Sequence, residues 1–258
     1  MATNRINTLF EQKKVNVLSV YFTAGYPELN DTETVITELV KNGTDLIEIG
    51  IPFSDPVADG PVIQQSSLVA LNNGISLKLI FEQLKNIRQK VDIPLVMMGY
   101  LNPVLQYGVE AFCKKCNEIG IDGLILPDIT PEIYEDEYKA IFEANNLHMI
   151  FLITPQSTPE RIRYIDSISG GFIYMVSSSS ITGAKSSIQK EQEAYFTRVK
   201  NLNLKNSQMI GFGISSRETF TTACKYATGA IIGSAFIKAL QEKGSLQERI
   251  SKFVKGLL

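Results

Sequence analysis

The 258-residue sequence predicts an α/β protein built as a single (β/α)8 barrel with extra helical segments. Two observations predict this class. The length suits such a barrel, which typically needs about 250 residues. Eight short apolar runs also alternate with eight amphipathic segments, and this repeated alternation is typical of a parallel sheet covered by helices. We expect one catalytic domain over residues 1–258, with a doubly wound open sheet as the alternative fold.

Most of the apolar runs are continuous stretches of Val, Ile, Leu and Met rather than polar–apolar alternations. Strands that are buried on both faces have this pattern, as they do in parallel sheets. In chain order the expected strands are Val15–Phe22, Leu46–Ile51, Leu95–Gly99, Gly123–Leu126, Met149–Ile153, Phe172–Val176, Met209–Gly211 and Ala230–Gly233.

The segments between these runs have helical periodicity. In the first of them, Val35, Ile36, Leu39 and Val40 share one face, as the 3.6-residue period requires. The expected helices are Asp31–Lys41, Leu77–Gln89, Val109–Ile119, Glu132–Ala144, Pro159–Ser167, Glu191–Leu202, Arg217–Tyr226 and Leu246–Val254.

The spacing of the strands is uneven. The longest intervals between strand starts run from Leu46 to Leu95 and from Phe172 to Met209. Segments that follow strands lie at the C-terminal end of a (β/α)8, or TIM, barrel, where active sites form. We therefore expect extended loops after the second and sixth strands to belong to the site.

Composition excludes several classes of protein. The formal net charge is −2, unlike the basic footprint of a nucleic-acid-binding domain. The first residues lack the apolar run of a signal peptide, and no window approaches the roughly 18 apolar residues of a membrane span. We expect a cytoplasmic protein.

Cysteine usage fits the same expectation. Three cysteines cannot all pair within one chain, which is typical of a reducing compartment. Cys113 and Cys116 form a C-x-x-C pattern, but they lie within a helical segment. Cys224 and the single histidine, His148, would be hard to assemble with them into four tetrahedral ligands. We expect buried structural thiols and no metal site.

Two carboxylates carry the first chemical signal. Glu48 interrupts an apolar strand, and burial would raise its pKa toward neutrality, which suits a proton shuttle. The alternative is a structural salt bridge inside the barrel. Asp59 lies in the following loop, beside Gly60-Pro61, where it could either share acid–base and electrostatic roles with Glu48 or serve a turn or helix cap.

Glycines at the ends of the last two expected strands carry the second signal. Gly211-Phe-Gly213-Ile-Ser215 and Gly233-Ser234 each follow a strand and open a helix. Glycine lets backbone N–H groups approach an anion, and barrels often bind phosphate here. Simple strand-to-helix turns are the alternative. After the sixth strand, the small polar segment Ser177–Ser187 suits a lid over the site.

One motif makes a family resemblance specific. The stretch Glu48-Ile-Gly-Ile-Pro-Phe-Ser-Asp-Pro-Val-Ala-Asp59-Gly-Pro resembles the signature of tryptophan synthase alpha subunits. The resemblance spans almost the whole chain. Further matching stretches are Tyr21–Pro27, Met98–Pro103, Leu126–Asp128, Thr182–Ala184 and Gly233–Phe236.

The resemblance implies a lyase that cleaves indole-3-glycerol phosphate into indole and glyceraldehyde 3-phosphate by a retro-aldol reaction. It assigns Glu48 as the acid/base group for indole C3 and Asp59 as the carboxylate facing the indole nitrogen. Substrate contacts are expected from Phe22, Tyr100, Ile153, Tyr174 and Thr182, although Phe22, Tyr100 and Ile153 could equally be core. Phosphate contacts are expected from Gly183, Gly213, Gly233 and Ser234.

The resemblance also implies a partner. The family needs no cofactor of its own and passes indole to a pyridoxal-phosphate beta subunit in a heterotetramer of two alpha and two beta chains. Asp55-Pro56 corresponds to the segment that meets this partner. The run Ser177–Ser180 departs from the Arg and Gly expected there, which puts the closure contacts of the lid in doubt. The alternatives are a free-standing indole-releasing lyase, a non-catalytic activator of the beta subunit, and another phosphate-binding barrel such as an isomerase.

Overall fold

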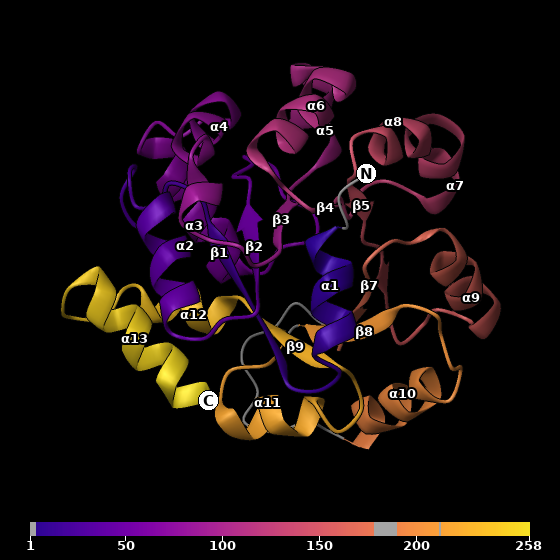
Figure 1. Cartoon of the computed structure of the whole chain (residues 1–258). Helices are drawn as coiled ribbons and strands as arrows, with labels where there is room; N and C mark the ends of the chain where they lie inside the picture. The colour runs from indigo at the N-terminus through magenta and orange to yellow at the C-terminus, as the bar shows by residue number, and fades with distance from the viewer. Residues whose placement is uncertain (1–3, 178–189, 212) are drawn as a thin grey trace.

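A parallel β-sheet closed into a barrel forms the centre of the molecule. The structure is a computed structural model that describes residues 4–177, 190–211 and 213–258. Figure 1 shows the strands forming a ring with helices around it. All of the strand pairs are parallel, in the order β5-β4-β3-β2-β1-β9-β8-β7-β6. The predicted fold class, a (β/α)8 barrel with extra helices, is confirmed.

Every expected strand is present, and its ends differ from the expected ends by no more than two residues. The strands are β1 (Val17–Thr23), β2 (Leu46–Gly50), β3 (Leu95–Met98), β4 (Gly123–Ile125), β5 (His148–Met149), β6 (Leu152–Ile153), β7 (Phe172–Val176), β8 (Ser207–Gly211) and β9 (Gly229–Ile232).

The fifth expected strand is split into β5 and β6, and this split lies where the ring closes. β5 pairs with β4, whereas β6 pairs with β7. Between them, Ile150 N donates to Leu124 O (2.9 Å), and Phe151 O accepts from Tyr174 N (3.0 Å). The single segment 148–153 therefore bonds to both neighbours, and the hydrogen-bonded ladder runs around the whole barrel.

The expected helices are also present. They are α2 (Thr32–Lys41), α4 (Leu77–Leu84) with the 3-10 turn η1 (Ile87–Gln89), α6 (Val109–Ile119), α7 (Pro131–Ile133) with the π-helical turn η2 (Tyr134–Tyr138) and α8 (Lys139–Ala144), α9 (Pro159–Ile168), α10 (Lys190–Lys200), α11 (Arg217–Ala223) and α13 (Leu246–Leu257). Several begin at a side chain that accepts from a first-turn N–H, which is the usual N-cap. These caps are Ser76, Thr130, Thr158, Ser216 and Ser245.

Within the described ranges, four further helices lie outside the expected set of eight: α1 (Arg5–Gln12), α3 (Pro61–Asn72), α5 (Leu101–Tyr107) and α12 (Ser234–Ala239). Of these, the sequence indicated only that a helix opens at Ser234. The extended segment after β2 contains the loop 51–60 followed by α3, so much of the surplus length there is helical.

Helix α1 covers the N-terminal end of the barrel, and Figure 1 shows it lying over the middle of the ring. Ile6 is fully buried, and a Cβ placed on Gly123 would lie 3.0 Å from its Cδ1. Asn4 caps α1 and also donates to the backbone oxygens of Asp122 (2.8 Å) and Asn146 (2.9 Å). With this end closed, the C-terminal end of the strands is left for a site.

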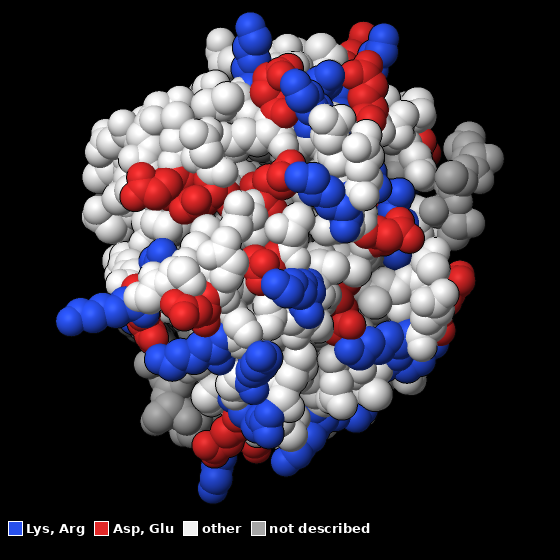
Figure 2. Space-filling view, turned by 60° about the vertical axis from the view of Figure 1, so that its left-hand side comes forward, with Lys and Arg blue, Asp and Glu red and all other residues white. Residues whose placement is uncertain are grey.

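The helix layer carries charges of both signs. On the face shown in Figure 2, basic and acidic side chains are interspersed. Several exposed pairs are in contact, such as Lys85 with Glu82 (3.4 Å) and Lys252 with Glu242 (2.7 Å). Exposed pairs of this kind contribute little to stability, because water screens them.

The cysteines lie apart from the barrel mouth. Cys113 and Cys116 are buried free thiols on α6, and Cys116 Sγ lies 3.8 Å from Met97 Sδ. Cys224 is a half-buried free thiol. In the described part of the chain, no group of three or more His, Cys, Asp or Glu could hold a metal ion. No described helix combines the length and apolarity needed to cross a membrane.

Candidate active site at the C-terminal end of the barrel

The strand register places Glu48 inside the barrel. Tyr21 of β1 pairs with Glu48, and Thr23 pairs with Gly50. On its other side Glu48 pairs with Val96 of β3. Paired residues of parallel strands point to the same face, and alternate residues share it. Ser19, Tyr21 and Thr23 therefore line the interior together with Glu48 and Gly50.

Glu48 is a buried carboxyl without a charged partner. Its side chain is 0% exposed, and Ser19 Oγ donates to Oε1 at 3.0 Å. Oε2 has no hydrogen-bond partner among the described residues. Burial raises the pKa of Glu48 to about 8, because the charged form loses its hydration, and Ser19 opposes this shift. None of the ion pairs of the described residues involves Glu48, so the salt-bridge alternative is not supported.

Asp59 is held at the mouth by a tyrosine from the next strand's loop. Tyr100, which follows β3, donates from its hydroxyl to Asp59 Oδ2 at 2.9 Å. The same hydroxyl accepts from Ala58 N at 3.0 Å, and the ring packs on Phe53 with centroids 5.2 Å apart. Burial raises the pKa of Asp59, and the Tyr100 hydrogen bond opposes it. The N-cap of α3 is Gly60 rather than Asp59, so the capping alternative is not observed.

Tyr174 reaches the same interior space from β7. It pairs with Leu152 on one side and Met209 on the other. A Cβ placed on Gly211 would lie 2.3 Å from the Tyr174 hydroxyl, so the ring occupies space that only glycine leaves open. Burial raises the pKa of Tyr174, and the negative charges of Glu48 and Asp59 raise it further. Tyr174 is thus brought together with both carboxylates.

Two of the expected pocket residues do not face this space. Phe22 pairs with Ile49, and Ile153 pairs with Met175, so both lie on the outer face of the sheet, fully buried against the helix layer. This position favours the core alternative for both residues, because each is one residue out of phase with the interior. Tyr21 and Leu152 take the inner positions instead. The polar alternation Ser19-x-Tyr21-x-Thr23 was the sequence signal for the inner face of β1.

The glycine turns lie at the ends of two neighbouring strands. Gly213 follows β8, is exposed and has φ +76°, a conformation that favours glycine. Gly233 follows β9, and the exposed Ser234 opens α12. Ser177 N donates to Gly211 O (3.1 Å), which ties the end of β7 to that of β8. Thr182, Gly183 and most of the expected lid lie outside the described residues.

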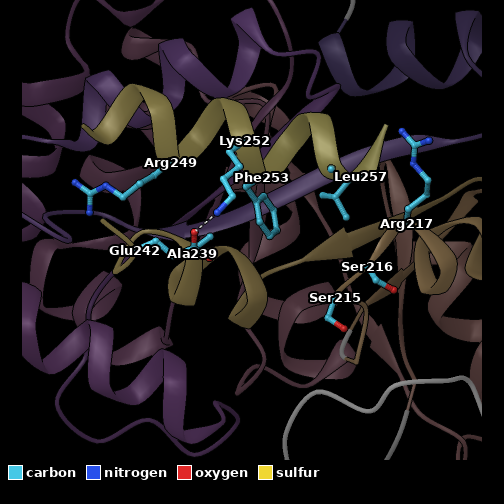
Figure 3. Close-up of a pocket in the computed structure, with 10 residues that line it drawn as sticks. Ser215, Ser216, Arg217, Ala239, Glu242, Arg249, Lys252, Phe253 and Leu257 are labelled. Carbon is cyan, nitrogen blue, oxygen red and sulfur yellow. Dashed lines mark hydrogen bonds and ion pairs between the residues drawn. The ribbon is translucent and has the colours of Figure 1, made fainter. Parts of the chain in front are cut away.

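A hollow lies on the outside of the barrel, between the start of α11 and the helices α12 and α13 (Figure 3). It has a volume of about 310 Å³, and Phe253 and Leu257 lie on one side of it. Lys252 at this hollow is paired with Glu242 at 2.7 Å. Arg217 and Arg249 extend away from it at opposite ends in Figure 3. None of the expected site residues lines it.

The fold and the site define a (β/α)8-barrel enzyme with a pair of carboxylates at its C-terminal end. Comparison with known proteins is consistent with this class and identifies one family within it. The family model described as tryptophan synthase alpha chain matches residues 8–256. The tryptophan synthase alpha chain of Flavobacterium johnsoniae is 63% identical over 251 residues, which cover 97% of this chain and 98% of that one.

Solved structures agree. Tryptophan synthase of Mycobacterium tuberculosis superposes with a TM-score of 0.89 at 33% identity, covering 99% of this chain and 97% of that one. Tryptophan synthase subunit alpha of Legionella pneumophila gives a TM-score of 0.88 at 32% identity, covering 99% and 97%. The chain belongs to the tryptophan synthase alpha chain family and has a lyase role in tryptophan synthesis.

Proposed function

We propose that this chain, acting as one catalytic domain, cleaves indole-3-glycerol phosphate into indole and glyceraldehyde 3-phosphate. The observation that carries the proposal is Glu48, a buried carboxyl with a free oxygen, no cation and a pKa of about 8, in a space shared with Tyr174. With this pKa, Glu48 is mainly protonated at neutral pH and can both give and take a proton.

The reaction balances with the two carboxylates alone. Glu48 delivers a proton to indole C3, which leaves a positive charge on the ring. Asp59 at the ring nitrogen stabilises that charge. The hydroxyl on the glycerol carbon next to the ring then gives its proton to the ionised Glu48, the carbon–carbon bond breaks, and its electron pair returns to the ring. The products are indole and the aldehyde, so we infer that the alpha reaction needs no metal or organic cofactor.

The ring pocket follows from the inner faces of the strands. We propose that Tyr21, Leu152, Tyr100 and Tyr174 contact the indole, with Tyr21 and Leu152 in place of Phe22 and Ile153. Thr182 stays in the proposal as a contact made by the lid, on the strength of the family resemblance.

For the phosphate group we propose the backbone N–H groups at Gly213, Gly233 and Ser234, together with Gly183. The first N–H groups of a helix lack acceptors within it, so the exposed start of α12 adds free donors beside the two glycine turns.

Gly213→Ala is expected to weaken phosphate binding by roughly tenfold, because a side chain at φ +76° shifts a loop whose backbone must approach the anion. Titration with inorganic phosphate followed by ³¹P NMR measures this. Gly74→Ala is the matched control: Gly74 also has positive φ, and nothing lies within 4 Å of its added Cβ. Equal phosphate affinity in both variants, or a crystal with phosphate bound elsewhere, would contradict the assignment.

We propose that a pyridoxal-phosphate beta subunit receives the indole in the cytoplasm, within a heterotetramer of two alpha and two beta chains. Exposed apolar side chains at the barrel mouth support a partner there. Val57, Leu105 and Ile133 follow β2, β3 and β4 respectively, and all are at least 42% exposed. Since these strands are neighbours, the three residues lie at the same end of the barrel as Asp55-Pro56.

The isolated chain is expected to release indole slowly, and the beta subunit of the same organism is expected to accelerate it by ordering the loop that carries Asp59. Indole release with and without that subunit tests this. Leu105→Asp should abolish most of the acceleration, whereas Val15→Asp should not, because Val15 is 59% exposed but lies before β1, at the opposite end. An activity unchanged by saturating beta subunit would favour a free-standing lyase.

A further inference from the structure

Tyr21 is a buried phenol to which the family resemblance assigned no role. It lies on β1 opposite Glu48, and its side chain is 8% exposed. Its neighbours on the inner face of the strand, Ser19 and Thr23, have partners in Glu48 (3.0 Å) and Ser66 (2.7 Å). The hydroxyl of Tyr21 is therefore a polar group inside the barrel that the proposed reaction has not yet used.

Gly50 fixes where this hydroxyl lies. A Cβ placed on Gly50 would be 2.1 Å from the Tyr21 hydroxyl and 2.5 Å from Cζ, so the phenol occupies the space of the missing side chain. Gly50 is two residues beyond Glu48 on the same strand, and hence on the same face. The Tyr21 hydroxyl therefore lies beside Gly50, the next inward-facing position after Glu48. Gly50 directly precedes the loop 51–60, which carries Asp59.

The charges around this phenol favour its role as a donor. Burial raises the pKa of Tyr21, and the negative charge of Asp59 is the next contributor. A side-chain hydrogen bond with Thr23 opposes this shift, and Tyr100 and Glu48 add smaller increases. The phenol therefore keeps its proton over the working pH range. On Asp59, Tyr100 occupies Oδ2, and no hydrogen bond to Oδ1 is observed among the described residues.

We propose that Tyr21 is a positioning residue for Asp59, whose carboxylate it holds from the interior while Tyr100 holds it from the mouth. The inference rests on the proposed function, in which Asp59 faces the indole nitrogen. Two phenols on one carboxylate keep it ionised and limit its rotation, so that its free lone pairs face the ring.

The decisive measurement is the pKa of the Asp59 carboxyl, followed by ¹³C NMR in the free protein and with indole and inorganic phosphate bound. Asp59→Asn assigns the signal. In Tyr21→Phe the Asp59 pKa should rise by roughly half to one unit, because a donor to the ionised form is lost. Tyr26→Phe is the control, since it removes another buried hydroxyl, one that accepts from Gln241 Nε2 at 2.8 Å, away from the carboxylates. An Asp59 pKa unchanged in both states of Tyr21→Phe overturns the proposal.

Steady-state kinetics of Tyr21→Phe distinguish a positioning role of the Tyr21 hydroxyl from a packing role of the Tyr21 ring. In Tyr21→Phe the ring remains, so KM should stay nearly constant while kcat falls by roughly three- to tenfold and the acid limb of its pH profile moves to higher pH. A raised KM with unchanged kcat would make Tyr21 a pocket wall only and would also overturn the proposal. If the wild-type chain releases no indole, the proposed function fails, whereas the NMR titration still decides the role of Tyr21.

Discussion

Glu48→Gln is expected to reduce indole release by roughly 10²–10⁴-fold, the usual contribution of a general acid–base group. The amide has nearly the same shape as the carboxyl and can still accept from Ser19, but it cannot transfer a proton at neutral pH. The measurement is kcat for indole release under saturating indole-3-glycerol phosphate, with purified chain and with the beta subunit. Near-normal turnover would remove Glu48 from the mechanism.

The control for this variant is its stability, which separates lost chemistry from lost folding. The pKa of Glu48 in the folded chain, about 8, lies above its ordinary value of 4.5, so the folded chain binds more protons than the unfolded chain between these two values. The stabilisation of the folded state by protonated Glu48 is fully present below pH 4.5 and is lost as pH rises through 8. Glu48→Gln cannot lose stability in this way. Its free energy of unfolding, measured with denaturant, should therefore rise relative to that of the wild type between pH 5 and pH 9. A variant that is equally inactive but poorly folded at pH 9 would point to a structural role for Glu48.

Asp59→Asn should lower kcat/KM for indole release by roughly 10²–10³-fold, comparable to the loss of a preorganised electrostatic group at a reacting centre. The amide can still accept from Tyr100, so the loop should keep its place. It carries no negative charge, however, and cannot balance the positive ring formed when C3 is protonated.

The matched control is Asp92→Asn, which removes the same charge from a side chain that is 95% exposed, in the segment before β3 at the opposite end of the barrel. It should leave kcat/KM within about twofold of the wild type, since exposed charges more than a Debye length away are screened. If the two variants lost activity equally, net charge rather than the position of Asp59 would be responsible.

The alternation of strands and helices could be predicted from the sequence, because local patterns produce it. Continuous apolar runs predict strands buried on both faces, and seven of the eight lie where expected as single strands. Glu48 was also recognisable, since a lone carboxylate in such a run is costly without a function. The glycine turn after β8 could also be found, because Gly213 adopts a positive φ that favours glycine. Helices α1, α3 and α5 were missed. Helices α1 and α5 are short, with 8 and 7 residues, and α3 has a mixed polar and apolar pattern without a clear helical period.

The sequence did not reveal which residues face one another inside the barrel. The side-chain period of a strand is two, so a shift of one residue moves a side chain to the other face. The register between β1 and β2 puts Tyr21, not Phe22, beside Glu48, and the register between β6 and β7 puts Leu152, not Ile153, beside Tyr174. The contact between Asp59 and Tyr100 joins loops 41 residues apart. Such contacts depend on the hydrogen-bonded pairing of whole strands and the closure of the ring, which no local stretch of sequence encodes.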